Sequence, residues 1–299
     1  MKIYNLIQKC LLLVFLIPAG VFAQSGTDSS GAAQDNSATE KPTPKPVKNT
    51  FDNALVINNQ TVEAEHAKNL DFVIQHRFGV VDNATDFWGF FAPSNIRLGL
   101  TYGITNSLSV GAGVTKDNYL VDLNLKYIFL KQTKGGEIPV TVGYYGNVSR
   151  SMLGQDNFLN QSDQYQATDR LSYFNELMVA RKFGSKLGLQ LAFTYSYFNL
   201  LDSGMSYANM GISFAGRYKV TPQGSVILDY DYPITKAAIN PAKPNLGIGY
   251  EIATSGHTFQ VFFTTADQIS NQNLRVYNQN DLLKRQFLIG FNITRNWGF

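Results

Sequence analysis

The last fourteen residues, Gln286 to Phe299, constrain the fold of this chain more than any other segment because they alternate almost without a break. One parity carries six large apolar residues and Arg295, while the other carries Leu288 and otherwise only small or polar residues. Since successive side chains of a β-strand point to opposite faces, the segment predicts a strand with one apolar and one mostly polar face. The apolar face has to be covered either by a protein core or by lipid.

Similar alternation recurs in twelve segments after residue 69. They span about residues 70–79, 95–104, 107–115, 119–130, 137–147, 170–183, 186–198, 207–219, 225–232, 245–252, 257–266 and 286–299. Opposite their apolar residues stand mostly Gly, Ser, Thr and Asn, with few charges. A soluble sandwich or lipocalin-like barrel would bury the apolar face and charge the other face, whereas a membrane barrel turns the apolar face to lipid. The pattern favours the membrane barrel.

Aromatic residues gather near the ends of these segments if the first strand starts at the periplasmic side and the directions then alternate. The outer ends carry Tyr119, Tyr144, Tyr173, Tyr195, Tyr197, Tyr230 and Tyr232, and the inner ends carry Tyr102, Tyr127, Phe129, Phe183, Tyr218, Tyr250, Trp297 and Phe299. Aliphatic residues lie between the two groups. This sorting is typical of the two aromatic girdles that flank the apolar band of a transmembrane barrel.

The connections between the segments show the asymmetry that the same orientation requires. The expected periplasmic turns are short (105–106, 132–136, 184–185, 221–224 and 253–256), while all expected outer loops except 116–118 are long (80–94, 148–169, 199–206, 233–244 and 267–285). Short turns on one side and long loops on the other are typical of outer-membrane barrels. The sequence therefore predicts an all-β, antiparallel, up-and-down transmembrane β-barrel of about twelve strands over residues 70–299.

The N-terminal residues predict export. In residues 1–23, Lys2 and Lys9 precede a short apolar run that ends in small residues, which is the pattern of a cleaved signal peptide. The run is too short for a membrane anchor, which needs about 18 apolar residues. Residues 24–50 are rich in Ser, Thr, Pro and Lys and predict a disordered tether. Residues 51–69 form a pre-barrel segment, with a short strand indicated at 54–57.

The residual charge and cysteine content exclude several functions. Without Lys2 and Lys9 the chain keeps 23 of its 25 basic residues against 22 acidic ones, a balance that gives no support for a nucleic-acid partner. Cys10, the single cysteine, falls within the predicted signal peptide. The mature chain is therefore expected to have neither a disulfide nor a thiolate nucleophile nor a cysteine-ligated metal.

Few charged residues share the parity that faces the lumen. We predict a lumen constriction formed by Arg77, Arg97, Asp122, Asp229 and Asp231, with further lumen charges at Lys126, Glu176, Arg217 and Glu251. An arginine pair facing an aspartate pair would make a transverse field in which a polar solute exchanges water for charged partners. The alternative is a structural ion-pair network that closes the lumen, with Arg217 pairing Asp229 or Lys219 pairing the aspartates.

Catalytic signals are few. The sequence contains neither a glycine-rich phosphate loop nor a His-Glu-x-x-His motif, and we assign no catalytic residue, no metal ligand and no cofactor. His76 has lipid-facing parity near the outer rim, as in outer-membrane lipid-acting enzymes that set a histidine beside a serine. Here no serine of matching parity and height adjoins it, which favours an interfacial histidine. We expect that the protein is not an enzyme.

Several phrases of the sequence resemble a known family. They are Val56 to Glu63, Gln75 to Gly79, Asn95 to Thr105, Leu108 to Gly113, and Lys126 to Ile128 followed by Leu130 to Gln132. Together they resemble a domain-of-unknown-function family of bacterial outer-membrane β-barrel proteins over about residues 50–299. The C-terminal strand ending in Trp297 and Phe299 likewise resembles the outer-membrane sorting end. These resemblances imply a barrel in the outer membrane of a Gram-negative cell and bring no activity with them.

Three functions remain open at this point. The first is a narrow, porin-like channel or binding barrel for a small polar solute. The second is a non-conducting structural or surface-interaction barrel that meets a partner through residues 148–169 and 267–285. The third is a lipid-acting outer-membrane enzyme that uses His76. The expected partners are the lipid bilayer, the barrel-assembly machinery and a small polar solute.

Overall fold

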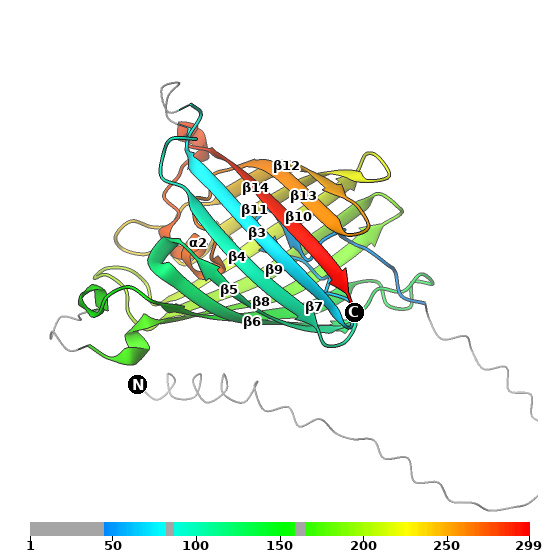
Figure 1. The fold of residues 1–299 in the computed structure, drawn as a ribbon, viewed down its shortest axis with the longest axis horizontal. Coiled ribbons are helices and arrows are strands. Elements are labelled where there is room, and N and C mark those ends of the chain that lie inside the picture. The colour runs from blue at the N-terminus through cyan, green and yellow to red at the C-terminus, as the bar shows by residue number, and fades with distance from the viewer. Residues whose placement is uncertain (1–44, 82–86, 159–164) are drawn as a thin grey trace, which may run out of the picture. The chain divides into compact units, whose positions relative to one another are not determined.

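Twelve antiparallel strands close into one barrel in the computed structural model, which describes residues 45–81, 87–158 and 165–299. The strands are β3 (Asn69–Val80), β4 (Asn95–Gly103), β5 (Leu108–Thr115), β6 (Leu120–Leu130), β7 (Thr141–Ser151), β8 (Leu171–Phe183), β9 (Leu187–Phe198), β10 (Ala208–Lys219), β11 (Gly224–Pro233), β12 (Asn245–Ala253), β13 (His257–Thr264) and β14 (Leu288–Gly298). Each strand pairs with its neighbours in sequence, and β14 closes the barrel against β3 (Figure 1). The predicted barrel class and strand number are confirmed.

The strand boundaries agree with the alternation to within a few residues except at β7. The segment predicted at 137–147 is displaced to Thr141–Ser151. Pro139 lacks a backbone N–H for the ladder. Thr133 closes a turn just before it: the Thr133 N–H donates to the Ile138 carbonyl, and the Thr133 hydroxyl accepts from the Ile138 N–H. Tyr144 consequently pairs with Tyr127 at the inner end of the barrel, so its predicted place in the outer girdle is wrong.

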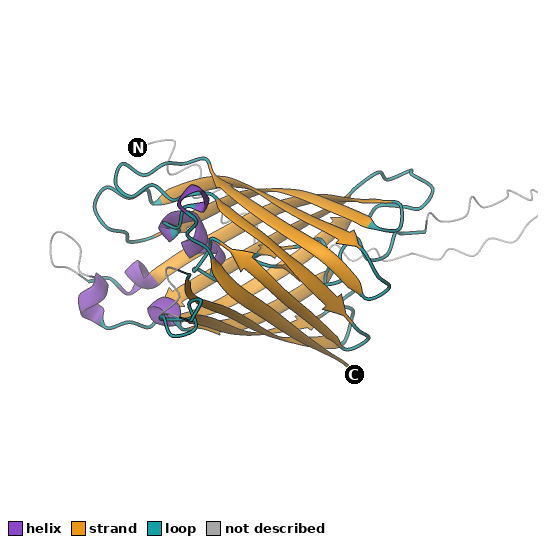
Figure 2. Ribbon diagram, turned by 90° about the horizontal axis from the view of Figure 1, so that it is seen from above, coloured by secondary structure: helices purple, strands orange, loops and turns teal. Residues whose placement is uncertain are grey.

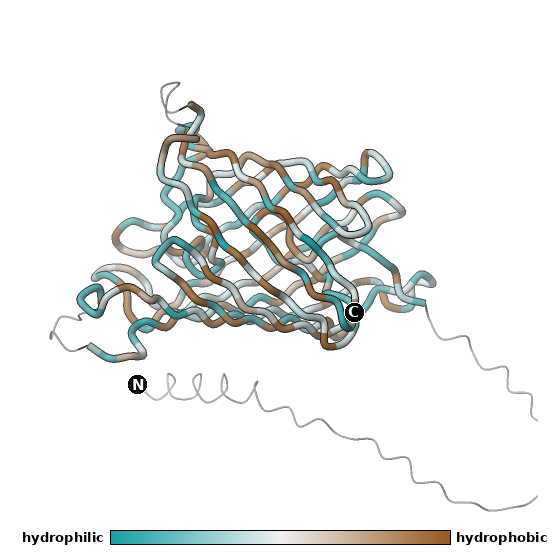
Figure 3. The backbone as a smooth tube through the Cα atoms, viewed as in Figure 1, coloured by the Kyte–Doolittle hydropathy of each residue, from teal (hydrophilic) through white to brown (hydrophobic). Residues whose placement is uncertain are grey.

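The barrel is apolar outside and polar inside. Exposed outward residues include Leu100, Leu123, Leu191, Phe193, Ile248, Val261 and Phe263, while buried lumen residues include Gln75, Ser109, Asp122, Ser149, Gln190, Ser213, Gln260 and Asn292. Figure 3 shows the alternation as apolar and polar stretches along each strand. This arrangement inverts the pattern of a soluble protein and fits a surface that faces lipid.

The two ends of the barrel differ in their connections. The connections 104–107, 131–140, 184–186, 220–223 and 254–256 lie at what we call the short-turn end. The described residues 81, 87–94, 116–119, 152–158, 165–170, 199–207, 234–244 and 265–287 lie at what we call the long-loop end, and residues 82–86 and 159–164 of the predicted outer loops are outside the described residues. The C-terminal strand finishes at the short-turn end, where Pro46 also pairs with Thr133 (Figure 1). The predicted separation of short and long connections is confirmed.

The helices of the described residues are short and lie at the long-loop end (Figure 2). They comprise α2 (Asn271–Tyr277) and four 3₁₀ turns (Asp117–Tyr119, Gln155–Phe158, Ala167–Arg170 and Leu282–Lys284). None of the helices in the described residues has the length and apolarity needed to span a membrane. A two-stranded hairpin, β1 (Leu55–Val56) and β2 (Asn59–Gln60), precedes the barrel strands.

Candidate functional site

The pre-barrel segment lies inside the lumen. Its hairpin turns at Ile57 and Asn58, and Ile57 adopts a positive φ of 53° that a β-branched residue rarely accepts. The carbonyl of Ile57 accepts bonds from Arg77 Nη2 at 3.1 Å and Asn292 Nδ2 at 2.9 Å. Contacts with the barrel wall therefore hold a turn that the isolated segment would disfavour. We call residues 51–66 the lumen segment.

Apolar side chains of the lumen segment pack against an apolar patch on the wall. Phe51, Val56, Ile57 and Val62 are all buried in one cluster with lumen-facing wall residues. Those wall residues are Ile128, Tyr145, Phe174, Met178, Ala180, Ala192, Ala215, Ile227 and Phe262. Burying such side chains contributes roughly 1.5–3 kcal/mol each, so the segment is a packed part of the fold.

The tip of the lumen segment lies between two predicted constriction residues. Arg77 Nη2 donates to Asn58 Oδ1 at 2.9 Å. Asn58 in turn donates its backbone N–H and its Nδ2 to Asp229 Oδ2, at 3.1 and 2.9 Å. Arg77 and Asp229 are both fully buried. The lumen segment therefore occupies the bore where these two charges were expected to face each other across water.

Arg217 pairs with Asp52 of the lumen segment, so the predicted Arg217–Asp229 pair is wrong. Lys219 lies 3.6 Å from the same Asp52 carboxylate, which also corrects its predicted pairing with Asp229 or Asp231. The physical reason is position: Arg217 and Lys219 are near the end of β10 at the short-turn end, where the lumen segment brings in its own carboxylate. Asp229 lies further along β11 and takes Asn58 instead.

Three further wall side chains bind the backbone of the lumen segment. Lys126 Nζ donates to the carbonyls of Ala54 and Glu63 at 2.9 and 3.0 Å. Gln190 accepts from Val62 N at 3.0 Å and donates to Gln60 O at 2.7 Å. Gln260 accepts from Ile57 N and donates to Leu55 O, and it also donates to Glu251 at 2.7 Å. These side chains bind backbone groups of a segment that pairs with no barrel strand over residues 54–63.

Helix α2 closes the lumen from the long-loop end. Arg275 Nη2 donates to Asp231 Oδ1 at 2.8 Å and to Ser213 Oγ at 2.8 Å, and its guanidinium lies 4.7 Å from the centroid of the Phe174 ring. Gln272 Nε2 donates to Asn147 Oδ1 at 2.5 Å and to Ser149 Oγ at 2.9 Å. Asp231, the fifth predicted constriction residue, is thus paired with Arg275 of α2, in the connection between β13 and β14.

Arg97 and Asp122 form the one ion pair between two predicted constriction residues among the described residues. Arg97 Nη2 and Nε donate to the two Asp122 oxygens at 2.7 and 3.0 Å, a bidentate pair. Arg97 Nη1 also donates to Gln75 at 3.3 Å. The pair joins β4 to β6 along one side of the wall, and the glycines of β5 leave it room because a Cβ at Gly113 would overlap the guanidinium.

Glu176 is a lumen carboxylate that takes part in none of the ion pairs described above. It stands between Phe174 and Met178 on β8 and is buried. Neither of its carboxylate oxygens has a hydrogen-bond partner among the described residues. The side chain therefore places a polar group at the edge of the apolar contact between wall and lumen segment.

Three adjoining cavities follow one another along the lumen. At the short-turn end a cavity of about 200 Å³ adjoins one of about 40 Å³, with which it shares Asn53, Ala54, Glu65 and Asp71. The latter shares Leu55, Gln60, Gln75, Arg97 and Tyr145 with a cavity of about 20 Å³ that reaches Gln272 of α2. The two small cavities are large enough for one or a few water molecules. They follow the wall past the Arg97–Asp122 pair.

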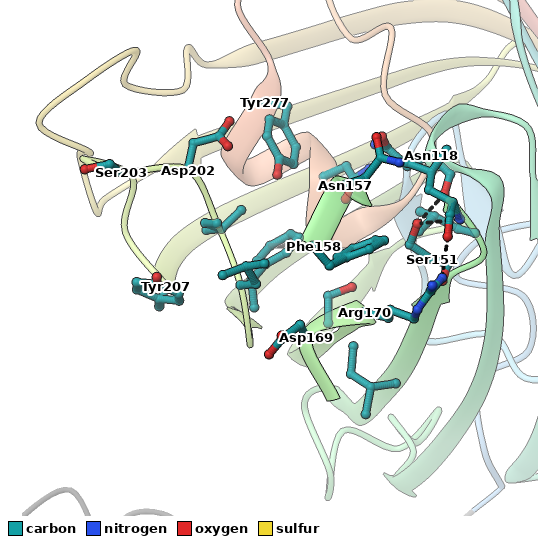
Figure 4. Close-up of a pocket in the computed structure, with 18 residues that line it drawn as sticks. Asn118, Ser151, Asn157, Phe158, Asp169, Arg170, Asp202, Ser203, Tyr207 and Tyr277 are labelled. Atoms are coloured by element: carbon teal, nitrogen blue, oxygen red, sulfur yellow. Dashed lines mark hydrogen bonds between the residues drawn. The ribbon is translucent and has the colours of Figure 1, made fainter. Parts of the chain in front are cut away.

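A larger cavity of about 820 Å³ opens on the other side of α2, at the long-loop end. Its lining combines aromatic rings with polar groups, and Figure 4 shows Asp202 and Tyr277 on one side of it and Arg170 with Ser151 on the other. Burial, with the nearby carboxylates of Asp202 and Asp117, raises the pKa of Tyr277 to about 12. The Tyr277 phenol is therefore neutral at physiological pH.

His76 lies on the outward face, as its parity predicts. Its ring stacks on Phe291 with centroids 5.0 Å apart and lies 4.5 Å from the Phe78 ring. Its Nδ1 has no hydrogen-bond partner in the described part of the chain. The described residues also hold no group of three or more His, Cys, Asp or Glu that could bind a metal ion.

Two features of the sequence could have indicated a filled lumen. Phe174 and Met178 share a face with Glu176 in the predicted strand 170–183, and residues 54–57 are an apolar run that precedes the barrel strands. The structure joins the two, because an apolar wall patch needs an apolar partner. Helix α2 had no comparable signal, since its sequence Asn-Gln-Asn-Leu-Arg-Val-Tyr carries no amphipathic repeat.

The apolar exterior, the closed strand order and the polar, filled interior define a membrane β-barrel whose lumen is occupied by its own chain. Residues 51–297 match the family model described as membrane bound beta barrel domain (DUF5777). The chain belongs to this family, and the match includes the lumen segment as well as the strands.

Solved structures of other barrels are similar to this chain at low sequence identity. An outer membrane channel from Pseudomonas putida F1 is 13% identical, with a TM-score of 0.48 over 79% of this chain and 98% of that one. The NanC porin is 11% identical (TM-score 0.49, 77% and 100%), and a KdgM porin in complex with disordered oligogalacturonate is 8% identical (0.47, 76% and 98%). These similarities concern the barrel alone. No curated protein matches the chain at a significant level.

Proposed function

We propose that the protein is an outer-membrane barrel that gives small polar solutes a narrow route through the lumen, and that the lumen segment and α2 close this route. The row of cavities along the wall carries the proposal, because the two smallest run between the lumen segment and strands β3 to β7. Polar and charged groups make up most of their lining. A solute on this route would exchange its water for such groups.

The five constriction residues take two roles in this proposal. Arg97 and Asp122 lie on the route and select what passes. Arg77, Asp229 and Asp231 hold the closing elements, since they bind Asn58 and Arg275. The other lumen charges divide similarly: Lys126 and Arg217 anchor the lumen segment, while Glu176 and Glu251 line its contact with the wall.

Single-channel recording in planar bilayers tests the proposal. Val56→Asp places an unpaired charge in the apolar contact and should expel the lumen segment without changing a barrel strand. We expect rare, small openings for the parent chain and sustained conductance for the variant. In the Val56→Asp background, Arg97→Gln and Asp122→Asn should change the preference for anions over cations in opposite directions. A folded variant whose lumen segment is accessible to protease and which still passes no ions contradicts the proposal.

A non-conducting barrel that meets a partner at its long-loop end is the second candidate. The small volume of the central cavities favours it. Part of the connection between β13 and β14 is engaged in the lumen through α2, which leaves the connection between β7 and β8 as the stronger candidate for contact. Loss of a co-purifying partner after replacement of Gln155 to Phe158 would support this candidate.

Export and outer-membrane insertion form part of the same proposal. The pattern of residues 1–23 supports cleavage before Gln24, and the aromatic end of β14 at Trp297 and Phe299 supports recognition by the barrel-assembly machinery. Fractionation of cell membranes and N-terminal sequencing of the mature chain test both. A mature protein that still begins at Met1 would contradict the signal peptide.

A further inference from the structure

An aromatic turn stands at the long-loop end of β3. It consists of residues 87–91, with the sequence Phe-Trp-Gly-Phe-Phe. Phe87, Trp88, Phe90 and Phe91 are 61%, 60%, 45% and 79% exposed. Four large exposed rings in five residues form an apolar patch of the kind that soluble surfaces avoid and that marks a contact with a partner or a membrane.

The aromatic turn is held in place. Gly79 N donates to Gly89 O at 3.0 Å, which fastens the turn to the end of β3. The approach requires glycine on both sides, because a Cβ at Gly89 would lie 2.2 Å from Gly79 O and a Cβ at Gly79 would lie 2.2 Å from Ala92 Cβ. Gly89 also has a positive φ of 85°, which glycine adopts without strain. The backbone of the aromatic turn is therefore fastened to the end of β3.

The aromatic turn adjoins the outer surface of the barrel. Phe90 lies 4.2 Å from Phe78, ring centroid to ring centroid, and Phe78 is an outward residue of β3. Phe78 in turn lies 4.5 Å from His76 and 6.1 Å from the outward Phe291 of β14. A continuous row of rings thus runs from the lipid-facing wall onto the aromatic turn. The turn extends the apolar exterior and does not cover the mouth of the lumen.

The neighbouring connection adds positive charge to the same rim. It is joined to the end of β3 by a bond from Val81 N to Phe287 O at 2.8 Å. Leu282 and Leu283 are exposed there, at 48% and 92%, and Lys284 and Arg285 beside them are exposed as well. Apolar side chains flanked by lysine and arginine are typical of segments that lie in the headgroup region of a bilayer.

We propose that the aromatic turn is a membrane-inserting element: Phe87, Trp88 and Phe91 enter the boundary between headgroups and acyl chains of the leaflet at the long-loop end, with Lys284 and Arg285 near the lipid phosphates. Tryptophan and phenylalanine favour that boundary. The element would fix the tilt and depth of the barrel on the β3–β14 side. This inference depends on the barrel crossing a bilayer and is independent of any passage through the lumen.

Trp88 provides its own probe because the chain contains only two tryptophans. Trp297→Phe leaves Trp88 alone, and Trp88→Phe leaves Trp297 of the opposite rim as a matched control. Each variant is folded into phosphatidylcholine vesicles with bromine atoms either near the headgroup or near the end of the acyl chains. We expect blue-shifted Trp88 emission that loses more intensity with the shallow bromines than with the deep ones, and that resists quenching by acrylamide in water.

Trp88 emission at the wavelength of a water-exposed indole, quenched by acrylamide and unaffected by either brominated lipid, would overturn the proposal. A turn that serves a protein partner would give that result. A second label covers the case in which the tryptophan variants fold poorly. Residues 24–299 contain no cysteine, so Phe91→Cys carries a single nitroxide. The proposal expects higher accessibility to dissolved oxygen than to a water-soluble nickel complex, and the reverse order would contradict it.

Discussion

Arg275 of α2 donates a hydrogen bond to Asn59 of the lumen segment, with 3.3 Å between Nη2 and Oδ1. The two elements that fill the lumen from opposite ends therefore touch. The same nitrogen also binds Asp231 and Ser213 of the wall. One guanidinium thus connects helix α2, the lumen segment and two strands of the wall.

Replacing Arg275 should open the long-loop half of the lumen. Arg275→Met keeps the length of the side chain and removes its donors, which leaves Asp231 buried with Ser213 and Asn245 as remaining partners. Breaking a buried ion pair costs about 3–5 kcal/mol, and we expect the lower part of that range. Residues 271–277 should lose hydrogen-exchange protection, while the barrel strands keep theirs.

Arg285→Met is the matched control, because Arg285 belongs to the same connection and is exposed. It should leave the protection of residues 271–277 unchanged. Equal effects of the two replacements would show that loss of a positive charge in this connection, and not the contact of Arg275 with Asp231 and Asn59, governs the position of α2.

The Asp52–Arg217 pair should respond asymmetrically to replacement of its two members. Arg217 is almost fully buried, whereas Asp52 is partly accessible and keeps Lys219 at 3.6 Å when Arg217 is removed. Asp52→Asn leaves a buried guanidinium without its carboxylate and should weaken docking of the lumen segment by about 3 kcal/mol. Arg217→Met should weaken it by about 1 kcal/mol. Proteolysis of the lumen segment under native conditions measures both, and a larger effect of Arg217→Met would contradict this account.

The barrel could be predicted from the sequence because membrane strands repeat one local rule. Alternation, strand-end aromatics and unequal connections each depend on near neighbours in the chain, and β3 to β14 follow them. The displacement of β7 has a long-range contribution, since the turn that delays the strand also pairs with Pro46. No local pattern at residues 137–147 reports that contact.

The filled lumen was much harder to predict. The parity of Arg77, Asp229 and Asp231 placed them inside correctly, but parity does not identify the partner of a lumen charge. Their actual partners, Asn58 and Arg275, come from segments outside the strands. The apolar residues Phe174 and Met178 on a polar face, with the apolar run at residues 54–57, were the local features that could have indicated a filled lumen.

Gly188 should control where the chain passes into the lumen. A Cβ at this position would lie 2.1 Å from the carbonyl oxygen of Thr50, a backbone atom that cannot turn aside. Gly188→Ala should therefore displace the lumen segment and increase its cleavage by protease, while the barrel still migrates as a folded species in unheated gels. Gly216→Ala is the control, since its Cβ would meet only flexible side chains, the Phe214 ring at 3.3 Å and Leu189 Cδ2 at 3.6 Å. Unchanged cleavage in Gly188→Ala would indicate that β9 yields instead.

Docking of the lumen segment should weaken as pH rises, because of Glu63. Burial raises the pKa of this carboxyl above its ordinary value of 4.5, against the opposing effects of the Phe51 backbone N–H, Lys126 and Arg217. An acid with a raised pKa in the folded state binds protons more tightly there than in the released segment. Its contribution is thus fully present below 4.5 and is lost as pH rises through the raised pKa. Hydrogen exchange of residues 51–66, corrected for the intrinsic effect of pH, should show this loss of protection. Glu63→Gln, which imitates the protonated form, should reduce the dependence, whereas Glu137→Gln in the exposed turn should leave it unchanged. Protection that falls toward low pH in the parent chain, or an undiminished slope in Glu63→Gln, would assign the dependence to another group.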